Sequence, residues 1–296
     1  MKVCLIGASG SIGWPLYNFL KKKVNIIGTF NSNKKKKLIE FSLGRKNSEI
    51  NLLNKLDKKD VVIFLAAKTN VSWVYKNPNK AYEINCKYTI NFLKKLIKKR
   101  IRIIYLSSAE VFNGKKGFYK ENSLPNPVNV YGKSKFEIEK FLKKTKYKNY
   151  QIIRTGRTIN MSNDYNCMIE DTYQRILNED AKMAKDNLFT ITDVRDFNGG
   201  ILKLIYLKSN RKYFHICSDQ VLTRVKFANI IKNKSKFKKK MKFKIVKFKN
   251  ISYSEPRAGK NNLSCKITKK ILKLKFKKAD KLIQEKVKLL DNNYII

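Results

Sequence analysis

Short apolar runs alternate with amphipathic segments through the first half of the chain. Each run is followed by a stretch in which apolar residues return at helical spacing. The pattern predicts strands at 3–6, 24–30, 61–67, 101–107 and 150–155, and helices at 11–22, 81–98 and 130–144. Runs that are apolar throughout are typical of strands covered on both faces. The alternation therefore predicts an α/β fold, a Rossmann-type doubly wound parallel sheet with right-handed crossovers.

The pattern is weaker after residue 155. It predicts helices at 169–177, 224–233 and 278–290 and strands at 188–192, 213–217 and 241–248, with Thr223 as an N-cap. We expect residues 1–155 to form the sheet domain and leave open a return of the chain to it around 188–217. We expect residues 156–296 to form mainly a smaller α+β lobe that covers the cleft.

The chain carries far more positive than negative charge. Its 296 residues include 67 Lys and Arg against 22 Asp and Glu, a formal net charge of +45. Such a balance suggests nucleic acid or an anionic membrane as a partner. Only ten of the basic residues are Arg, however, and the lysines are spread along the chain, as a bias toward A/T-rich codons would leave them. We therefore expect no dedicated nucleic-acid partner, although the charge should attract a phosphorylated ligand.

Cysteine usage and hydropathy bear on the compartment. The five cysteines are far apart and form no CxxC pair. This favours a reduced, cytoplasmic setting over a disulfide framework, and it predicts no metal site. No apolar run approaches the roughly 18 residues of a membrane-spanning helix, so we expect no membrane span.

The segment Gly7-Ala-Ser-Gly10-Ser-Ile-Gly13 joins the first strand to the first helix. A glycine turn at this place lets the backbone approach a pyrophosphate closely, and the helix N-terminus favours its negative charge. A purely structural turn is the alternative, because three glycines near a helix start are weak evidence alone. Ligands of such sheets bind beyond the carboxyl ends of the strands. We therefore expect a dinucleotide cofactor to contact Gly7, Ser9, Gly10, Ser11, Ile12, Gly13, Asn31, Ser32, Lys34, Ala66, Ala67, Lys68 and Thr155.

The end of the second predicted strand bears on which dinucleotide binds. An acid there would bind the adenosine ribose hydroxyls of NAD, but residues 29–33 include none and Lys34–Lys37 follow. Hydroxyl, amide and ammonium groups suit a 2′-phosphate better, so we favour NADP and keep NAD as the alternative. A solvated lysine loop is the other interpretation of the same residues.

Tyr131 and Lys135 lie four residues apart in a predicted helix, a spacing that puts both on one face. A nearby cation favours phenolate, so we expect Lys135 to lower the pKa of Tyr131 toward neutrality. A phenol tuned in this way can exchange a proton with an alkoxide or an alcohol. Ser108, at the end of a predicted strand, can hold the carbonyl oxygen.

These motifs resemble those of the extended short-chain dehydrogenase/reductases, the NAD-dependent epimerase/dehydratase superfamily. The likeness is carried by GASGSIG at 7–13, AAKTNV at 66–71, NPNKAYEIN at 77–85, LSSAEVFNG at 106–114, LPNPVNVYGKSK at 124–135 and IIRT at 152–155. Within the superfamily the chain most resembles the dTDP-4-dehydrorhamnose reductase family. The resemblance implies a reductase of a nucleotide-linked 4-keto sugar. An epimerase that retains NAD and a non-catalytic nucleotide-binding subunit are the alternatives, and a homodimer is left open.

The resemblance also implies roles for individual residues. Ser108, Tyr131 and Lys135 would be the catalytic trio, in which Tyr131 protonates the sugar carbonyl as hydride arrives and Lys135 also holds the nicotinamide ribose. Substrate contacts are expected from Trp73, Asn85, Glu110, Val111 and Phe112. The chain departs from the family where Ser108-Ala109 replaces the usual Thr-Asp of the reductases. Glu110 is kept without the Asp that precedes it in the dehydratases, so water elimination is not the expected reaction.

Overall fold

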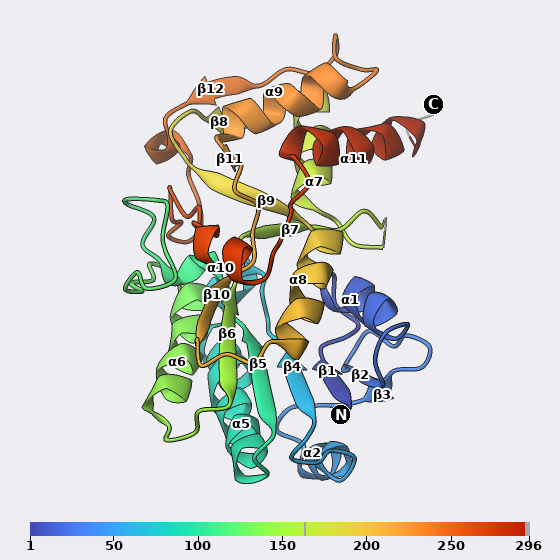
Figure 1. Ribbon diagram of the computed structural model, residues 1–296. Coiled ribbons are helices and arrows are strands. Elements are labelled where there is room, and N and C mark those ends of the chain that lie inside the picture. Colours follow the sequence, from blue (N-terminus) through green and yellow to red (C-terminus); the bar gives the residue numbers. More distant parts are fainter. Residues whose placement is uncertain (163, 294–296) are drawn as a thin grey trace.

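A parallel sheet organises most of the molecule. The computed structural model describes residues 1–162 and 164–293. Seven parallel strands lie in the order β10-β6-β5-β4-β1-β2-β3 (Figure 1). They are β1 (Val3–Ile6), β2 (Ile26–Phe30), β3 (Ile39–Glu40), β4 (Val61–Phe64), β5 (Arg102–Leu106), β6 (Tyr150–Arg154) and β10 (Tyr213–His215). The strand order reverses at β1, which confirms the predicted doubly wound Rossmann-type fold.

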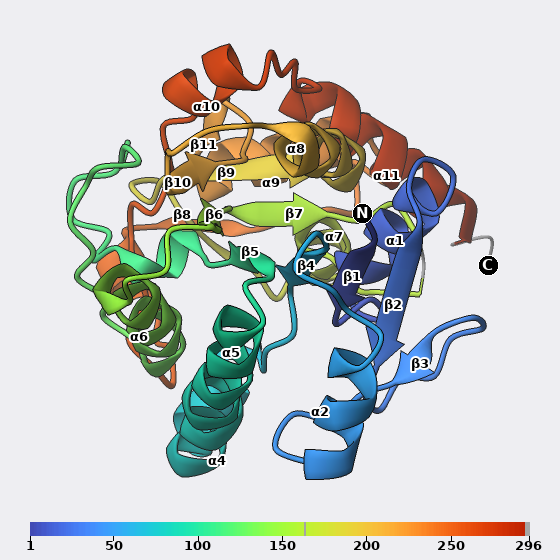
Figure 2. The same cartoon turned by 60° about the horizontal axis from the view of Figure 1, so that its bottom comes forward.

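Alternate residues of the central strands pack on opposite faces of the sheet. Val3, Leu5 and Ile63 contribute to one core, beneath α1 (Gly13–Leu20) and α8 (Val194–Tyr206). Cys4, Ile6 and Phe64 contribute to the other, beneath α2 (Lys46–Leu53), α5 (Thr89–Lys98) and α6 (Val130–Lys144). Figure 2 shows α8 and α5 on opposite sides of the sheet. A strand buried on both faces must be apolar at every position, which explains the continuous apolar runs in the sequence.

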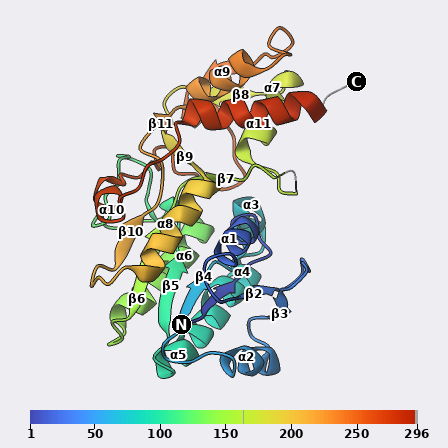
Figure 3. The same cartoon turned by 45° about the vertical axis from the view of Figure 1, so that its right-hand side comes forward.

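The second half of the chain builds a separate lobe above the carboxyl ends of the strands (Figure 3). Its strands are β7 (Arg157–Ile159), β8 (Lys182–Ala184), β9 (Phe189–Asp193), β11 (Val221–Leu222) and β12 (Lys244–Val246). Its helices α7 (Met168–Leu177), α9 (Arg224–Lys234) and α11 (Ala279–Asn293) share one apolar core. Thr223 caps α9 as predicted, because its Oγ1 accepts a hydrogen bond from Lys226 N at 3.1 Å.

Part of this second half returns to the sheet. β10 pairs with β6 in parallel, and α8 packs beside α1 on the same face. The chain therefore crosses between the sheet and the upper lobe more than once. The cleft between them is bordered by the carboxyl ends of the strands, the first turn of α6 and the strand β7.

Several boundaries differ from the sequence prediction for identifiable reasons. β4 ends at Phe64, since its partner residue in β1 is Ile6 and the glycine turn follows directly. The helix predicted at 81–98 consists of α4 (Pro78–Tyr82), a π-helical turn η1 (Glu83–Tyr88) and α5. The strands β3, β7, β8 and β11, the helices α3 (Val71–Lys76) and α10 (Lys266–Ile271) and the turn η3 (Phe248–Asn250) were not predicted, because they are too short to show a period. The prediction also missed α2, which has the same eight residues as α1 in length, and the 13-residue helix α8, where Gly199 and Gly200 disfavour a helix. Among the described residues, every helix is too short or too polar to cross a membrane.

Candidate active site

The turn between β1 and α1 is a glycine cradle without room for side chains. Gly7 has φ +86°, which residues other than glycine rarely adopt. A Cβ at Gly13 would lie 2.1 Å from the Gly7 carbonyl oxygen, so only glycine lets α1 start against the turn. Within the described residues, the backbone N–H groups of Ser11 and Ile12 donate to no protein acceptor. Free N–H groups at a helix N-terminus suit an anion.

A cavity of about 340 Å³ lies beside this turn, between the ends of β2 and β4. Five residues predicted to contact the cofactor line it together, namely Asn31, Ser32, Ala66, Ala67 and Lys68. Phe41, Leu43 and Ile84 add apolar walls. The structure places Lys34 differently: it is exposed and outside the lining of this cavity. Its neighbour Lys35 is the half-buried lysine of this loop, with Nζ 3.3 Å from Asp164 Oδ2.

Asn85 supports the cofactor side of the cleft from behind. It is buried in the π-helical turn η1, where its Oδ1 accepts from Lys68 N at 2.8 Å and its Nδ2 donates to Lys68 O at 3.0 Å. Both bonds fix the backbone that follows β4. Asn85 thus holds the loop that lines the cavity beside the glycine turn, and it does not line the cavity that contains Ser108.

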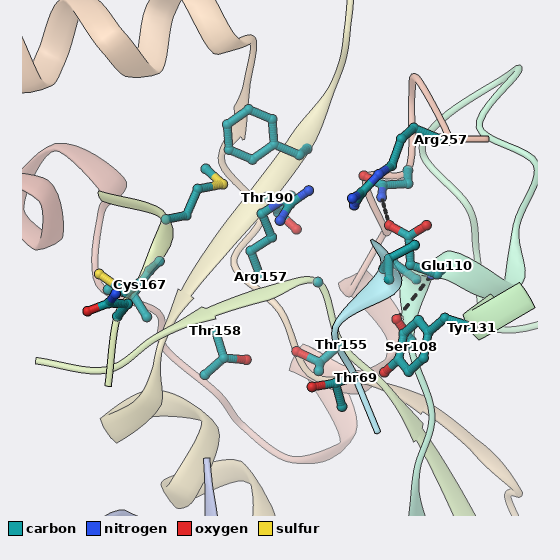
Figure 4. A pocket seen from close by; sticks show the side chains of 18 residues that line it. Thr69, Ser108, Glu110, Tyr131, Thr155, Arg157, Thr158, Cys167, Thr190 and Arg257 are labelled. Carbon is teal, nitrogen blue, oxygen red and sulfur yellow. Dashed lines mark hydrogen bonds between the residues drawn. The ribbon is translucent and has the colours of Figure 1, made fainter. Parts of the chain in front are cut away.

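Ser108 and Tyr131 face one cavity from two different elements (Figure 4). Ser108 caps the short helix η2 (Ala109–Val111), because its Oγ accepts from Glu110 N at 3.1 Å. Asn129 caps α6 in the same way, with Oδ1 accepting from Gly132 N at 2.7 Å. A Cβ at Gly132 would lie 2.1 Å from the Glu110 carbonyl oxygen, so this glycine lets α6 approach η2. The two caps thus hold Ser108 and Tyr131 on the lining of the same cavity.

Burial sets the protonation of Tyr131. It raises the pKa of this phenol well above its ordinary value of 10; the Glu110 carboxylate raises it further, and the hydrogen bond with Ser108 lowers it. Our expectation that Lys135 lowers this pKa toward neutrality is wrong. The Lys135 ammonium lies 6.0 Å from the centre of the Tyr131 ring, and desolvation of the phenolate outweighs any attraction. Tyr131 is therefore a neutral phenol at pH 7, the form that can donate a proton.

Lys135 is buried one helical turn below Tyr131. Its Nζ donates to Leu106 O at 2.8 Å and lies 4.8 Å from the centre of the Tyr105 ring. Burial lowers the pKa of Lys135 to about 7, because the ammonium loses its hydration there. The charge of this side chain therefore changes near neutral pH.

The cavity that Ser108 and Tyr131 face has a volume of about 300 Å³ and extends into the upper lobe. Thr155 lines it, although its hydroxyl donates to Ile216 O at 2.8 Å. Glu110 also lines it, with Oε2 accepting from Asn129 Nδ2 and Oε1 from Asn261 Nδ2, each at 2.8 Å. A carboxylate with both oxygens held in this way keeps its position in the cavity wall.

Three arginines gather around this cavity and were missed in the sequence. Arg157 and Arg257 line it, and Arg224 joins them in an adjoining cavity of about 140 Å³. Burial and the charge of Arg157 lower the pKa of Arg224 to about 9. Arg257 forms an ion pair with Glu255, and the Arg224 guanidinium lies 5.3 Å from the centre of the Phe189 ring. The rarity of arginine could have pointed to them: only ten of the 67 basic residues are Arg, so each arginine stands out against the lysines.

Three more of the expected substrate contacts, besides Asn85, lie outside this cavity. Val111 and Phe112 are fully buried in a small core behind η2, where the Phe112 ring stacks on Tyr119 with centroids 4.2 Å apart. These two residues were wrongly assigned to the substrate cavity, because the capped turn directs them inward. Trp73 lies in α3 with Lys68 Nζ 5.5 Å from its ring, outside the cavity lining, while Thr69 and Val71 line the cavity.

Comparisons with known proteins agree with this architecture. The RmlD substrate binding domain family matches residues 1–291. The chain is 29% identical over 140 residues to methionine adenosyltransferase 2 subunit beta of Bos taurus, a match that covers 47% of this chain and 42% of that protein. It is 36% identical over 86 residues to a dTDP-4-dehydrorhamnose reductase of Aggregatibacter actinomycetemcomitans, covering 29% of each. The matched stretch thus spans less than half of either curated relative.

Solved structures share the fold over nearly the whole chain. A hypothetical dTDP-4-dehydrorhamnose reductase from Sulfolobus tokodaii is 25% identical with a TM-score of 0.79, covering 93% of this chain and 96% of that one. A dTDP-4-dehydrorhamnose reductase from Bacillus anthracis in complex with NADP is 21% identical with a TM-score of 0.79, covering 98% and 99%. A UDP-glucose 4-epimerase from Thermotoga maritima, solved with UDP-glucose, is 16% identical with a TM-score of 0.82, covering 99% of each chain.

Proposed function

The chain belongs to the RmlD substrate binding domain family, and on that premise we propose that it is an NADP-dependent reductase of a nucleotide-linked 4-keto sugar, with Tyr131 as proton donor. One observation carries the proposal. Ser108 and Tyr131 line a cavity together with Arg157 and Arg257, and Arg224 lines the cavity that adjoins it. Lys135 is buried behind Tyr131, with Nζ 6.0 Å from the centre of its ring, and the glycine cradle follows β1 in the same parallel sheet. The glycine cradle would bind the diphosphate of a dinucleotide. Ser108, Tyr131 and Lys135 would bind and protonate a carbonyl, and the arginines would bind the phosphates of the substrate.

The cofactor side fits a nicotinamide dinucleotide. Its diphosphate would lie at the free N–H groups of Ser11 and Ile12, in a turn where a Cβ at Gly13 would clash with Gly7. Its adenosine end would lie in the cavity lined by Asn31 and Ala66. When bound, such a group supplies the hydride. The residues after β2 include no acid, which favours NADP, and NAD remains the alternative.

The chain's own residues supply the rest of the chemistry. The Ser108 hydroxyl holds the carbonyl oxygen in place, and Tyr131 transfers its proton to that oxygen as the carbon is reduced to an alcohol. Glu110 and burial keep the phenol protonated until that step. The charged form of Lys135 stabilises the phenolate that is left and holds a ribose hydroxyl.

The upper lobe supports a nucleotide sugar as substrate. Guanidinium groups are well suited to bind phosphate, because they present several donors in a fixed plane. Arg157, Arg224 and Arg257 would bind the diphosphate, and the rings of Phe248 and Tyr253, which line the adjoining cavity, are placed to contact the base. Residence in the cytoplasm and a homodimeric state remain predictions.

An assay of cofactor consumption tests the proposal. Nucleotide-linked 4-keto sugars are screened with NADPH, and the loss of its absorbance is compared with the alcohol formed. The proposal expects one NADPH consumed for each alcohol. Sugar interconversion with no net NADPH loss would instead show the epimerase, which the Ser108-Ala109 sequence and the epimerase neighbour both favour as the second candidate.

A non-catalytic subunit is the third candidate, favoured by the match to the methionine adenosyltransferase subunit. The complete Ser108, Tyr131 and Lys135 set argues against it, because a protein without catalysis has no need to keep all three. NADPH binding without turnover of any keto sugar would favour this candidate.

A further inference from the structure

Two residues between β7 and α7, Asn160 and Tyr165, contact the glycine turn. Asn160 Nδ2 donates to Ser11 O at 2.8 Å, and the Tyr165 hydroxyl donates to Ser9 O at 2.7 Å. These contacts join residues 149 and 156 positions apart in the sequence. The Asn160 side chain is buried, so its hydrogen bond is shielded from solvent. The upper lobe therefore contacts the anion-binding turn directly.

The two bonds determine how the turn presents its N–H groups. A peptide unit is planar and trans, so its C=O and N–H point in opposite directions. The Ser11 carbonyl shares a peptide unit with the N–H of Ile12, one of the free donors of the turn. By fixing that carbonyl, Asn160 fixes the direction in which the Ile12 N–H points. Tyr165 fixes the peptide that joins Ser9 to Gly10, whose N–H closes the turn by donating to Gly7 O at 3.2 Å.

The loop after β2 holds the same turn from the other side. Asn33 Nδ2 donates to Ser9 O at 3.1 Å, so this carbonyl accepts hydrogen bonds from both Asn33 and Tyr165. Lys35 Nζ lies 3.3 Å from Asp164 Oδ2 and 5.8 Å from the centre of the Tyr165 ring. Side chains from both lobes therefore meet over the turn.

The same chain segment continues into the wall of the other cavity. Asn166, Cys167 and Met168 follow Tyr165 directly and line the cavity that contains Ser108 and Tyr131. Tyr165 thus contacts the turn while the residues directly after it line the second cavity, so a ligand that shifts these residues at one place changes the contacts at the other. The two binding events then favour each other by the same factor.

We propose that Tyr165 and Asn160 are positioning residues that couple dinucleotide binding at the glycine turn to substrate binding in the second cavity. The inference rests on the proposed function, since it needs both ligands. Neither the turn motif nor the catalytic trio supplies such a coupling between the two binding places.

Equilibrium binding tests the coupling. The affinity of the intact chain for NADPH is measured by fluorescence with and without a nucleoside diphosphate, chosen as the tightest binder among dTDP, UDP, GDP and ADP. In the unsubstituted protein the nucleoside diphosphate should tighten NADPH binding about fivefold, a typical coupling between sites. Tyr165→Phe should weaken NADPH binding about five- to tenfold through one lost hydrogen bond. It should also reduce the coupling factor to near one, and Asn160→Ala should do the same.

Tyr147→Phe is the matched control, because the Tyr147 hydroxyl donates to a backbone carbonyl, Ile101 O, at 2.7 Å, outside the cleft. This variant should keep both the affinity and the coupling. Melting temperatures of all variants show whether an effect is local. Unchanged NADPH affinity and coupling in Tyr165→Phe, or no coupling in the unsubstituted protein, would overturn the inference. Failure of the unsubstituted protein to bind NADPH would overturn the proposed function instead.

Discussion

The proposed cofactor side and the proposed substrate side of the cleft offer different groups to a ligand. The cofactor side is made of backbone: free N–H groups in a turn where Gly7 and Gly13 leave no room for a Cβ. The substrate side is made of charged side chains, with Arg157, Arg224 and Arg257 contributed by three separate segments. A site made of backbone N–H groups is specified by a short sequence motif. A site made of side chains from separate segments forms only when the upper lobe has folded. A substitution should therefore affect one side and spare the other, and the predictions below test that separation.

The largest expected effect is on turnover alone. Tyr131→Phe removes the proton donor and keeps the ring that packs against Val74 and Ala81. We predict a loss of kcat of about 10²–10⁴-fold, the usual contribution of a positioned acid, with NADPH affinity nearly unchanged. Steady-state kinetics and fluorescence titration measure the two quantities. Normal turnover in this variant would remove Tyr131 from its assigned role.

A change in the glycine cradle should affect the cofactor side. In Gly13→Ala the new Cβ would lie 2.1 Å from a backbone oxygen that cannot give way easily. Such overpacking costs about 1–3 kcal/mol, and we predict about a hundredfold weaker NADPH binding. Gly199→Ala is the control, since a Cβ there has nothing within 4 Å and alanine favours its helix. Full NADPH affinity in Gly13→Ala would contradict the backbone description of this side.

A change among the arginines should affect the substrate side. Arg224→Met removes one guanidinium from the adjoining cavity, together with its contact over the Phe189 ring, and keeps an unbranched side chain at this position. We predict a KM for the nucleotide sugar raised about ten- to thirtyfold, the value of one charge-assisted hydrogen bond, with unchanged NADPH affinity. Arg211→Met, in the connection before β10, is the control. Weaker NADPH binding in Arg224→Met would show that the two sides are not separable.

The smallest expected effect is a pH dependence. The pKa of Lys135 is lowered to about 7 by burial, so its charged form prevails below that pH and is lost as pH rises through it. If the ammonium is the active form, kcat/KM should fall by up to about tenfold between pH 7 and 8, as expected for loss of one essential proton. The raised pKa of Tyr131 adds no further loss near neutrality. A profile that is flat from pH 6 to 9 would contradict this assignment.

The two sides also differ in how far the sequence predicted them. The strands, the turn at Gly7–Gly13 and the pair Tyr131–Lys135 follow from local patterns, because periodicity and spacing are properties of one segment. Arg224 and Arg257 meet only through tertiary packing, which no local pattern records. The sequence also did not show how deeply individual side chains are buried. Burial reverses the expected pKa shift of Tyr131 and removes Phe112 from the cavity.

A crystal structure with NADPH soaked in would test the central claim most directly. The account predicts the diphosphate on the N–H groups of Ser11 and Ile12, with the Tyr131 hydroxyl directed toward the nicotinamide ring. A turn without bound diphosphate, or a Tyr131 oxygen directed away from the ring, would contradict it.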